Sequence, residues 1–170
     1  NVNRQNVIYV GANDGMLHAF NASNGQELLA FVPSRVYRNL SRLTDKSYNT
    51  NHRYFVDGTP EVQDACMDTT VGSTCTTWRT MLVGSLGAGG QGIFALDVTS
   101  PSTFAEAQAA NIVKWEFTDA DDPQLGYVLS QPLIRRMANG KFAAIFSSGY
   151  NSGESDGAMG NGDAYIFIVY

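Results

Sequence analysis

The residues best suited to chemistry in this sequence are oxygen-bearing side chains in a glycine-rich stretch near its end. Glu154, Asp156, Asn161 and Asp163 all fall within NSGESDGAMGNGD, residues 151–163. Carboxylate and amide oxygens on a flexible loop are the ligands that a hard cation such as calcium requires. Their spacing does not match the ligand pattern of an EF-hand, and a solvated loop between strands has the same composition. Calcium binding by these four residues is a hypothesis beside that simpler interpretation.

The remaining polar side chains indicate structure rather than catalysis. The acidic run Asp119, Asp121 and Asp122 is typical of a solvated turn. His18 lies in an alternating, strand-like segment and His52 in a polar loop, so neither indicates a ligand set. No nucleophile with a base and no phosphate-cradling loop is recognisable. The glycines of 84–92 join two predicted strands rather than opening a helix, and no catalytic residues are expected.

Cys66 and Cys75 are the two cysteines of the chain, and they flank a short, mostly polar stretch. Their proximity predicts a local disulfide, the alternative being two free thiols as in a cytosolic protein. A metal site is not expected here, because further Cys or His ligands are missing nearby. Trp78 and Trp115 are interpreted as packing aromatics, with exposed sugar-binding platforms as the alternative.

Composition limits the class of protein. The chain has 170 residues, 44% hydrophobic and 16% charged, with a formal net charge of -5. These values are typical of a folded domain with many tight turns, and scattered Lys and Arg leave no electrostatic footprint for nucleic acid. No apolar run approaches the roughly 20 residues that cross a bilayer, and the polar start is not a signal peptide.

The elements that must position these residues are mostly strands. In the segment Tyr9–Phe20 an apolar run enters the turn Asn13-Asp14-Gly15 and an alternating run leaves it, which predicts a β-hairpin. A second turn at 21–25 leads into a third strand, 26–32. An amphipathic helix is expected near 35–44, because apolar residues recur there at three- and four-residue spacing. Further strands are predicted at 54–56, 60–65, 78–85, 92–98, 112–117, 131–137, 141–147 and 164–170.

The strands repeat a common plan, aligned on Val10-Gly11, Val83-Gly84 and Ser148-Gly149. Such repeats predict an all-β fold, a partial β-propeller with quinoprotein-like blades at about 7–32, 54–117 and 127–170. Because a propeller has roughly four to eight blades, residues 1–170 are expected to be part of a single propeller domain and a fragment of a longer chain. The alternative is a complete sandwich or small barrel.

Four segments in this order carry a family resemblance: YVGANDGMLHAFNASNGQELLAFVP, YFVDGTPEVQDA, MLVGSLGAGGQGIFALDVTSP and LGYVLSQPLIRRMANGKFAAIFSSGYNS. Together they resemble the carboxy-terminal propeller of PilY-type (PilC-type) proteins of bacterial type IV pili, nearly from end to end. The turn Asn13-Asp14-Gly15 is the chief marker of this resemblance.

The resemblance implies a non-enzymatic protein that is exported through the periplasm to the outer surface and acts at the pilus tip. It implies support of pilus assembly and extension, twitching motility, adhesion to host cells or surfaces and virulence, with minor pilins as partners. Many members bind calcium in the propeller, beyond the blade at which this sequence ends, so calcium is not transferred to these residues.

Two other functions fit the same blades. A quinoprotein-like dehydrogenase would hold pyrroloquinoline quinone with calcium, and would need a catalytic Asp, a stacking Trp and commonly a disulfide of adjacent cysteines. Cys66 and Cys75 are not adjacent. A carbohydrate-binding module would use Trp78 or Trp115 as its platform.

Overall fold

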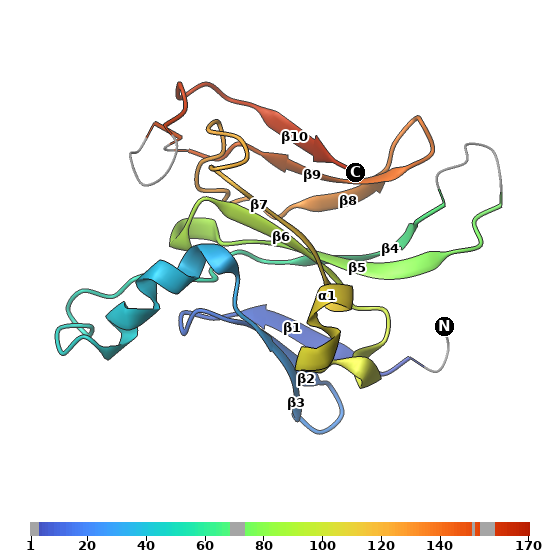
Figure 1. The fold of residues 1–170 in the computed structure, drawn as a ribbon, viewed down its shortest axis with the longest axis horizontal. Coiled ribbons are helices and arrows are strands. Elements are labelled where there is room, and N and C mark those ends of the chain that lie inside the picture. The colour runs from blue at the N-terminus through green and yellow to red at the C-terminus, as the bar shows by residue number, and fades with distance from the viewer. Residues whose placement is uncertain (1–3, 69–73, 151, 154–158) are drawn as a thin grey trace.

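Three antiparallel sheets lie face to face in layers, as a computed structural model shows for residues 4–68, 74–150, 152–153 and 159–170 (Figure 1). The all-β fold of antiparallel strands predicted from the sequence is confirmed. Within the described residues the few helices are short, and none has the length and apolar character needed to span a membrane.

The first sheet has the order β1-β2-β3 and contains the predicted opening hairpin. Its strands are β1 (Val7–Gly11), β2 (Leu17–Asn21) and β3 (Glu27–Phe31). Burial alternates along β1 and at the start of β2, so that one face points to the interior. The turn requires Gly15, because its φ of +98° lies in the left-handed region that side chains disfavour.

The middle sheet has the order β4-β5-β6-β7 and is covered on both faces. Its strands are β4 (Glu61–Cys66), β5 (Trp78–Ser85), β6 (Gly92–Asp97) and β7 (Val113–Thr118). Six consecutive residues of β5 and five of β6 are buried. A sheet enclosed between two layers explains these continuous apolar runs.

The third sheet has the order β10-β9-β8 and lies on the other side of the middle sheet. Its strands are β8 (Leu133–Arg136), β9 (Phe142–Ser147) and β10 (Ile166–Val169). In the alignment of the repeats, the first sheet holds counterparts of β5, β6 and β7. The third holds counterparts of β4, β5 and β6 within the described residues.

Two separate hydrophobic layers result, because successive residues of β5 and β6 point to opposite faces. Leu82, Phe94 and Leu96 pack toward the first sheet. Met81, Val83, Ile93 and Ala95 pack toward the third, where they meet Ile134, Ala144 and Phe146.

Two predicted elements differ in the structure. The amphipathic helix is present as successive 3-10 turns, Ser34–Thr44, with Val36 fully buried. The segment 54–56 is not a strand, although Phe55 and Val56 are 0% and 1% exposed. Its apolar side chains serve the core below the first hairpin rather than a sheet. The other helices are the 3-10 turns Gly87–Gly89, Pro101–Thr103 and Glu106–Gln108, and α1 (Ala109–Ile112).

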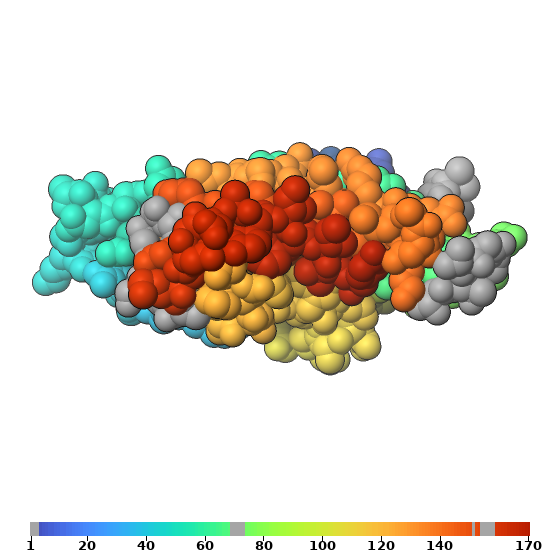
Figure 2. Space-filling model, turned by 90° about the horizontal axis from the view of Figure 1, so that it is seen from above, coloured from blue at the N-terminus to red at the C-terminus, as the bar shows by residue number. Residues whose placement is uncertain are grey.

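The outward faces of the first and third sheets carry exposed apolar side chains. Ile8 and Val10 of β1 are 56% and 44% exposed, and Ile166 and Ile168 of β10 are 74% and 46% exposed. Figure 2 looks onto the third sheet, where β10 runs along the surface. These faces have the alternating pattern of a sheet that could be covered by a further layer.

Candidate interaction site

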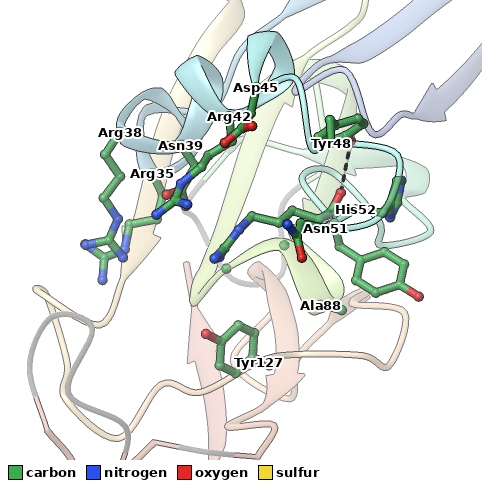
Figure 3. A pocket seen from close by; sticks show the side chains of 14 residues that line it. Arg35, Arg38, Asn39, Arg42, Asp45, Tyr48, Asn51, His52, Ala88 and Tyr127 are labelled. Carbon is green, nitrogen blue, oxygen red and sulfur yellow. Dashed lines mark hydrogen bonds between the residues drawn. The ribbon is translucent and has the colours of Figure 1, made fainter.

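An arginine-lined pocket opens beside the 3-10 helix Ser34–Thr44, with a cavity volume of about 450 Å³ (Figure 3). The helix supplies one wall and the loop 45–54 another, while the glycine-rich turn at 88–90 and Tyr127 complete it. We call it the arginine pocket. Its charged lining residues are Arg35, Arg38, Arg42, Arg53 and Asp45.

The 3-10 conformation determines how two of these arginines are presented. With three residues per turn, side chains three positions apart eclipse one another, so Arg35 and Arg38 project from the same side of the helix. Figure 3 shows the side chains of Arg35, Arg38 and Arg42 on one wall of the opening. A regular α-helix would have turned them about 60° apart at this spacing.

Arg35 is anchored by a buried ion pair with Asp119, which follows β7. The Asp119 side chain is 0% exposed and that of Arg35 is 16% exposed. One residue earlier, the backbone N–H and the hydroxyl of Ser34 both donate to Oε2 of Glu116 at 2.8 Å. The helix is therefore fixed to the middle sheet at its start. The prediction of a solvated turn at Asp119 is wrong, because Asp119 is buried against Arg35, which lies four strands earlier in the sequence.

The two other acids of that run serve the turn itself. Asp121 accepts hydrogen bonds from the backbone N–H and the hydroxyl of Thr118 at 2.8 and 3.1 Å, and Asp122 accepts from the backbone N–H of Gln124 at 2.9 Å. These are local turn contacts, of the kind that Asp side chains commonly make.

The opposite side of the pocket is aromatic. The ring centroids of Tyr48 and His52 are 5.4 Å apart and those of His52 and Tyr54 are 5.6 Å apart, with the second pair edge to face. The Tyr48 hydroxyl donates to the Arg53 carbonyl at 3.4 Å (Figure 3). The rings therefore hold one another and the loop in place.

Among the described residues that line the pocket, Asp45 is the one acid, and its carboxylate faces its own loop. Oδ1 accepts hydrogen bonds at 2.8 Å from both the backbone N–H and the hydroxyl of Ser47. These hydrogen bonds, with the nearby Arg42 charge, lower the pKa of Asp45 below its ordinary value. The pocket as a whole is a positively charged, hydrogen-bonding cavity suited to an anion.

The predicted disulfide between Cys66 and Cys75 is present, with the two Cα atoms 6.0 Å apart. It closes the loop between β4 and β5. Asp68, beside it, accepts hydrogen bonds from the backbone N–H groups of Thr76 and Thr77, and these lower its pKa. Because Cys66 and Cys75 are bonded to each other, neither of them supplies a thiolate that could hold a metal.

The calcium hypothesis involves four residues, of which Glu154 and Asp156 lie outside the described residues. Asn161 and Asp163 are described, and they contact each other. Asn161 Nδ2 donates to Asp163 Oδ2 at 2.9 Å and to the Tyr165 hydroxyl at 3.1 Å. These contacts shape a turn before β10, and calcium binding by the four residues stays a prediction.

The marker turn Asn13-Asp14-Gly15 joins two parts of the fold. Asn13 Oδ1 accepts from the Phe55 backbone N–H at 3.1 Å, and Asp14 Oδ1 accepts from the Met16 backbone N–H at 3.0 Å. The first bond attaches the hairpin to the segment that enters the core. Both contacts are structural, as Asx residues in turns usually are.

His18 has two acidic partners that sequence reasoning missed. Its Nδ1 lies 2.5 Å from Glu27 Oε1 and its Nε2 lies 2.9 Å from Asp14 Oδ2. Partial burial lowers the pKa of His18, but the hydrogen bonds and charges of Glu27 and Asp14 outweigh it, so that the pKa is raised. Glu27 pairs with Phe20 in the register of β2 and β3, and it comes within reach of His18 only once these strands pair, which the spacing along the chain does not reveal.

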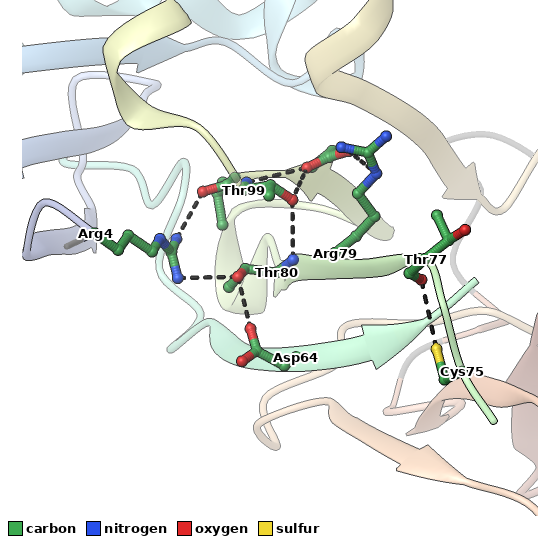
Figure 4. A network of polar contacts seen from close by, with 9 residues as sticks. Arg4, Asp64, Cys75, Thr77, Arg79, Thr80 and Thr99 are labelled. Carbon is green, nitrogen blue, oxygen red and sulfur yellow. Dashed lines mark hydrogen bonds and ion pairs between the residues drawn. The ribbon is translucent and has the colours of Figure 1, made fainter. Parts of the chain in front are cut away.

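A polar network joins the start of the chain to the middle sheet (Figure 4). Arg4 donates to the Thr80 hydroxyl at 3.0 Å and to the Val98 carbonyl at 2.6 Å, and Thr80 donates to Asp64 at 2.6 Å. Burial raises the pKa of the neighbouring Tyr9 to about 12, although the Arg4 charge opposes the shift. These hydrogen bonds link the segment before β1 to the middle sheet.

The two tryptophans differ in environment. Trp115 packs against the hydrophobic layer between the middle and third sheets. Trp78 is 53% exposed, with its ring centroid 6.1 Å from that of Phe142 in an edge-to-face arrangement. The packing interpretation holds for Trp115.

Layered antiparallel sheets of three and four strands are typical of the β-propeller class. Comparison with known proteins specifies the class further. The PilY1 beta-propeller domain family matches residues 1–169. The crystal structure of the Pseudomonas aeruginosa PilY1 C-terminal domain superimposes with a TM-score of 0.68 at 37% identity, covering 98% of this chain and 28% of that one.

Two curated relatives agree. A type IV pilus biogenesis factor PilY1 homolog of Xylella fastidiosa is 47% identical over 162 residues, 95% of this chain and 10% of that protein. PilY1 of Pseudomonas aeruginosa strain UCBPP-PA14 is 42% identical over 153 residues, 89% of this chain and 12% of that protein. The chain thus spans about a tenth of the length of these relatives. It belongs to the PilY1 beta-propeller family, as the sequence resemblance predicted.

Proposed function

We propose that this chain is a non-enzymatic binding domain of a type IV pilus biogenesis factor that acts at the pilus tip. In this role it supports pilus assembly and extension, twitching motility and attachment to surfaces or host cells, and it contacts minor pilins outside the cell. The observation that carries the proposal is the match to relatives named as pilus biogenesis factors over nearly the whole chain.

The surfaces of the fold support binding rather than catalysis. The polar clusters of the described residues are engaged in turns, in ion pairs and in the hydrogen-bond network around Arg4. The exposed features are a charged pocket and two apolar sheet faces. Pockets and faces of this kind recognise other molecules.

We also propose that the three sheets are consecutive blades of one propeller whose further blades cover the outward faces of the first and third sheets. The exposed isoleucines of β1 and β10 support this arrangement, since each blade of a propeller buries its faces against its neighbours.

The test is an in-frame deletion of these 170 residues from the chromosomal gene of the bacterium that encodes them. We expect loss of sheared surface pili and of twitching, both restored by the intact gene in trans. A second deletion in a strain that cannot retract pili separates assembly from extension, because pili return there only if the domain opposes retraction. Normal piliation and twitching in the deletion strain, with the variant protein present, would overturn the proposal.

A further inference from the structure

The arginine pocket stands out because its charge opposes that of the chain. The formal net charge is -5, yet among the described residues four arginines and one aspartate line this one opening. Arg38, Arg42 and Arg53 are exposed, and they come from two different segments. A local concentration of guanidinium groups on an acidic protein attracts an anion to one place rather than to the whole surface.

The arginines are carried by backbone that is already fixed. Val36 is fully buried between Arg35 and the other helix arginines, and Ser34 and Arg35 are bound to Glu116 and Asp119. On the other side, Arg53 is two residues before Phe55, whose side chain is buried and whose N–H is held by Asn13. A preorganised wall loses little conformational freedom when a ligand enters, so more of the interaction appears as affinity.

The guanidinium geometry favours a carboxylate. Its planar fork donates two parallel N–H bonds to the two oxygens of a carboxyl group, and several forks in one cavity can take successive carboxylates. At about 450 Å³ the arginine pocket has the size of sites that enclose a compact ligand. A flat membrane surface would meet only its rim.

The aromatic side of the pocket discriminates between an acidic peptide and an acidic saccharide. A sugar ring stacks on an open aromatic face. Here the His52 ring lies between Tyr48 and Tyr54, edge to face with the latter, so the rings are engaged with one another. They offer ring edges rather than open faces, which suits the short stems and backbone of a peptide.

We infer that the arginine pocket binds a short acidic segment of a protein partner, with Arg42 and Arg53 contacting its Asp or Glu carboxylates. The inference rests on the pocket alone and does not depend on a role in pilus assembly.

The test is fluorescence anisotropy of the purified protein with tetraglutamate that carries a neutral fluorophore. We expect saturable binding that weakens as salt rises from 20 to 300 mM, because exposed charges are screened. Arg42→Gln with Arg53→Gln should weaken binding at least about tenfold, since each lost fork removes a charge-assisted contact. Arg35 is left intact because of its buried partner.

The matched control is Arg136→Gln with Lys141→Gln, which removes the same charge from the β8–β9 hairpin outside the pocket lining. Circular dichroism confirms that both double variants fold. An equal loss in the control pair, or no binding of tetraglutamate to the wild type at low salt, would overturn the inference. Tighter binding of tetragalacturonate, or of phosphatidylglycerol vesicles, at the same arginines would assign the pocket to a saccharide or to lipid instead.

Discussion

The middle and third sheets are built on the same hairpin plan, yet they are buried differently. In β6 the first five residues are buried, whereas β10 alternates between exposed and half-buried residues. Both strands are apolar, with the sequences GIFALD and IFIV. The difference comes from the neighbours of each sheet, because only the middle one is enclosed by two layers. Stability in this chain should therefore be concentrated in the middle sheet.

The largest test of this comparison is Phe94→Ala against Ile168→Ala. The Phe94 ring is 1% exposed and its centroid lies 5.2 Å from that of Phe31, so it joins the first and middle sheets. Its removal should lower the free energy of unfolding by about 3–5 kcal/mol, from lost burial and the cavity left behind. Ile168, at 46% exposed, should cost less than about 1 kcal/mol.

Urea denaturation followed by tryptophan fluorescence measures both variants. Equal losses would contradict the comparison and mean that the outer face is covered in solution. Size-exclusion chromatography then shows whether a second copy covers it.

The second test is Asp119→Asn, which leaves Arg35 beside a neutral partner in a nearly closed site. We expect a loss of about 2–3 kcal/mol, below the range for fully buried pairs because the Arg35 side chain is 16% exposed. The control is Asp121→Asn, which weakens only a local turn contact. A variant of Asp119 as stable as that control would show that the ion pair does not hold the helix to the middle sheet.

The third test concerns the loop closed by Cys66 and Cys75 at the end of the middle sheet. Replacing both with Ser should lower the free energy of unfolding by about 2 kcal/mol, because a loop with a sequence separation of 9 is released in the unfolded chain. The reduced wild-type protein should match the double variant. A much larger loss would place this loop among the elements that carry the stability of the core.

Local signals in the sequence were enough for the strands and for the cysteine pair. Turn residues such as Asn13 and Gly15, and alternating runs such as 16–20, determine hairpins within a few residues. The layered fold followed from recognising the repeat. The sequence did not predict the conformation of 54–56. Its apolar residues indicated a paired strand, but in the structure they pack into the core.

The candidate site was harder to predict for the same reason. The amphipathic helix near 35–44 was predicted, but the pocket forms only where that helix, the loop 45–54 and the turn at 88–90 meet. Asp119 pairs with Arg35 across 84 positions of sequence, and no local pattern reports such a contact. The 3-10 conformation of Ser34–Thr44 was not predicted from the sequence either.

The smallest expected effect is a pH dependence of the stability that arises in the first sheet. A doubly protonated His18 donates to both Glu27 and Asp14, so the folded state raises the pKa of His18 above 6.5. Because the folded pKa is the higher one, this contribution to stability is complete below pH 6.5 and is lost as pH rises through the folded pKa. We expect the urea midpoint to fall slightly between pH 5.5 and 8.5, and the fall to be smaller in His18→Gln.

The matched control is His52→Gln, which removes the other histidine of the chain and leaves the contacts of His18 with Glu27 and Asp14 in place. The decisive measurement is an NMR titration of the His18 ring. A midpoint at or below 6.5 would show that the two carboxylates do not hold the proton. A raised midpoint that returns toward 6.5 in Glu27→Gln would assign the effect to the pairing of β2 with β3. The pairing of β2 with β3 would then be a part of the fold that senses pH.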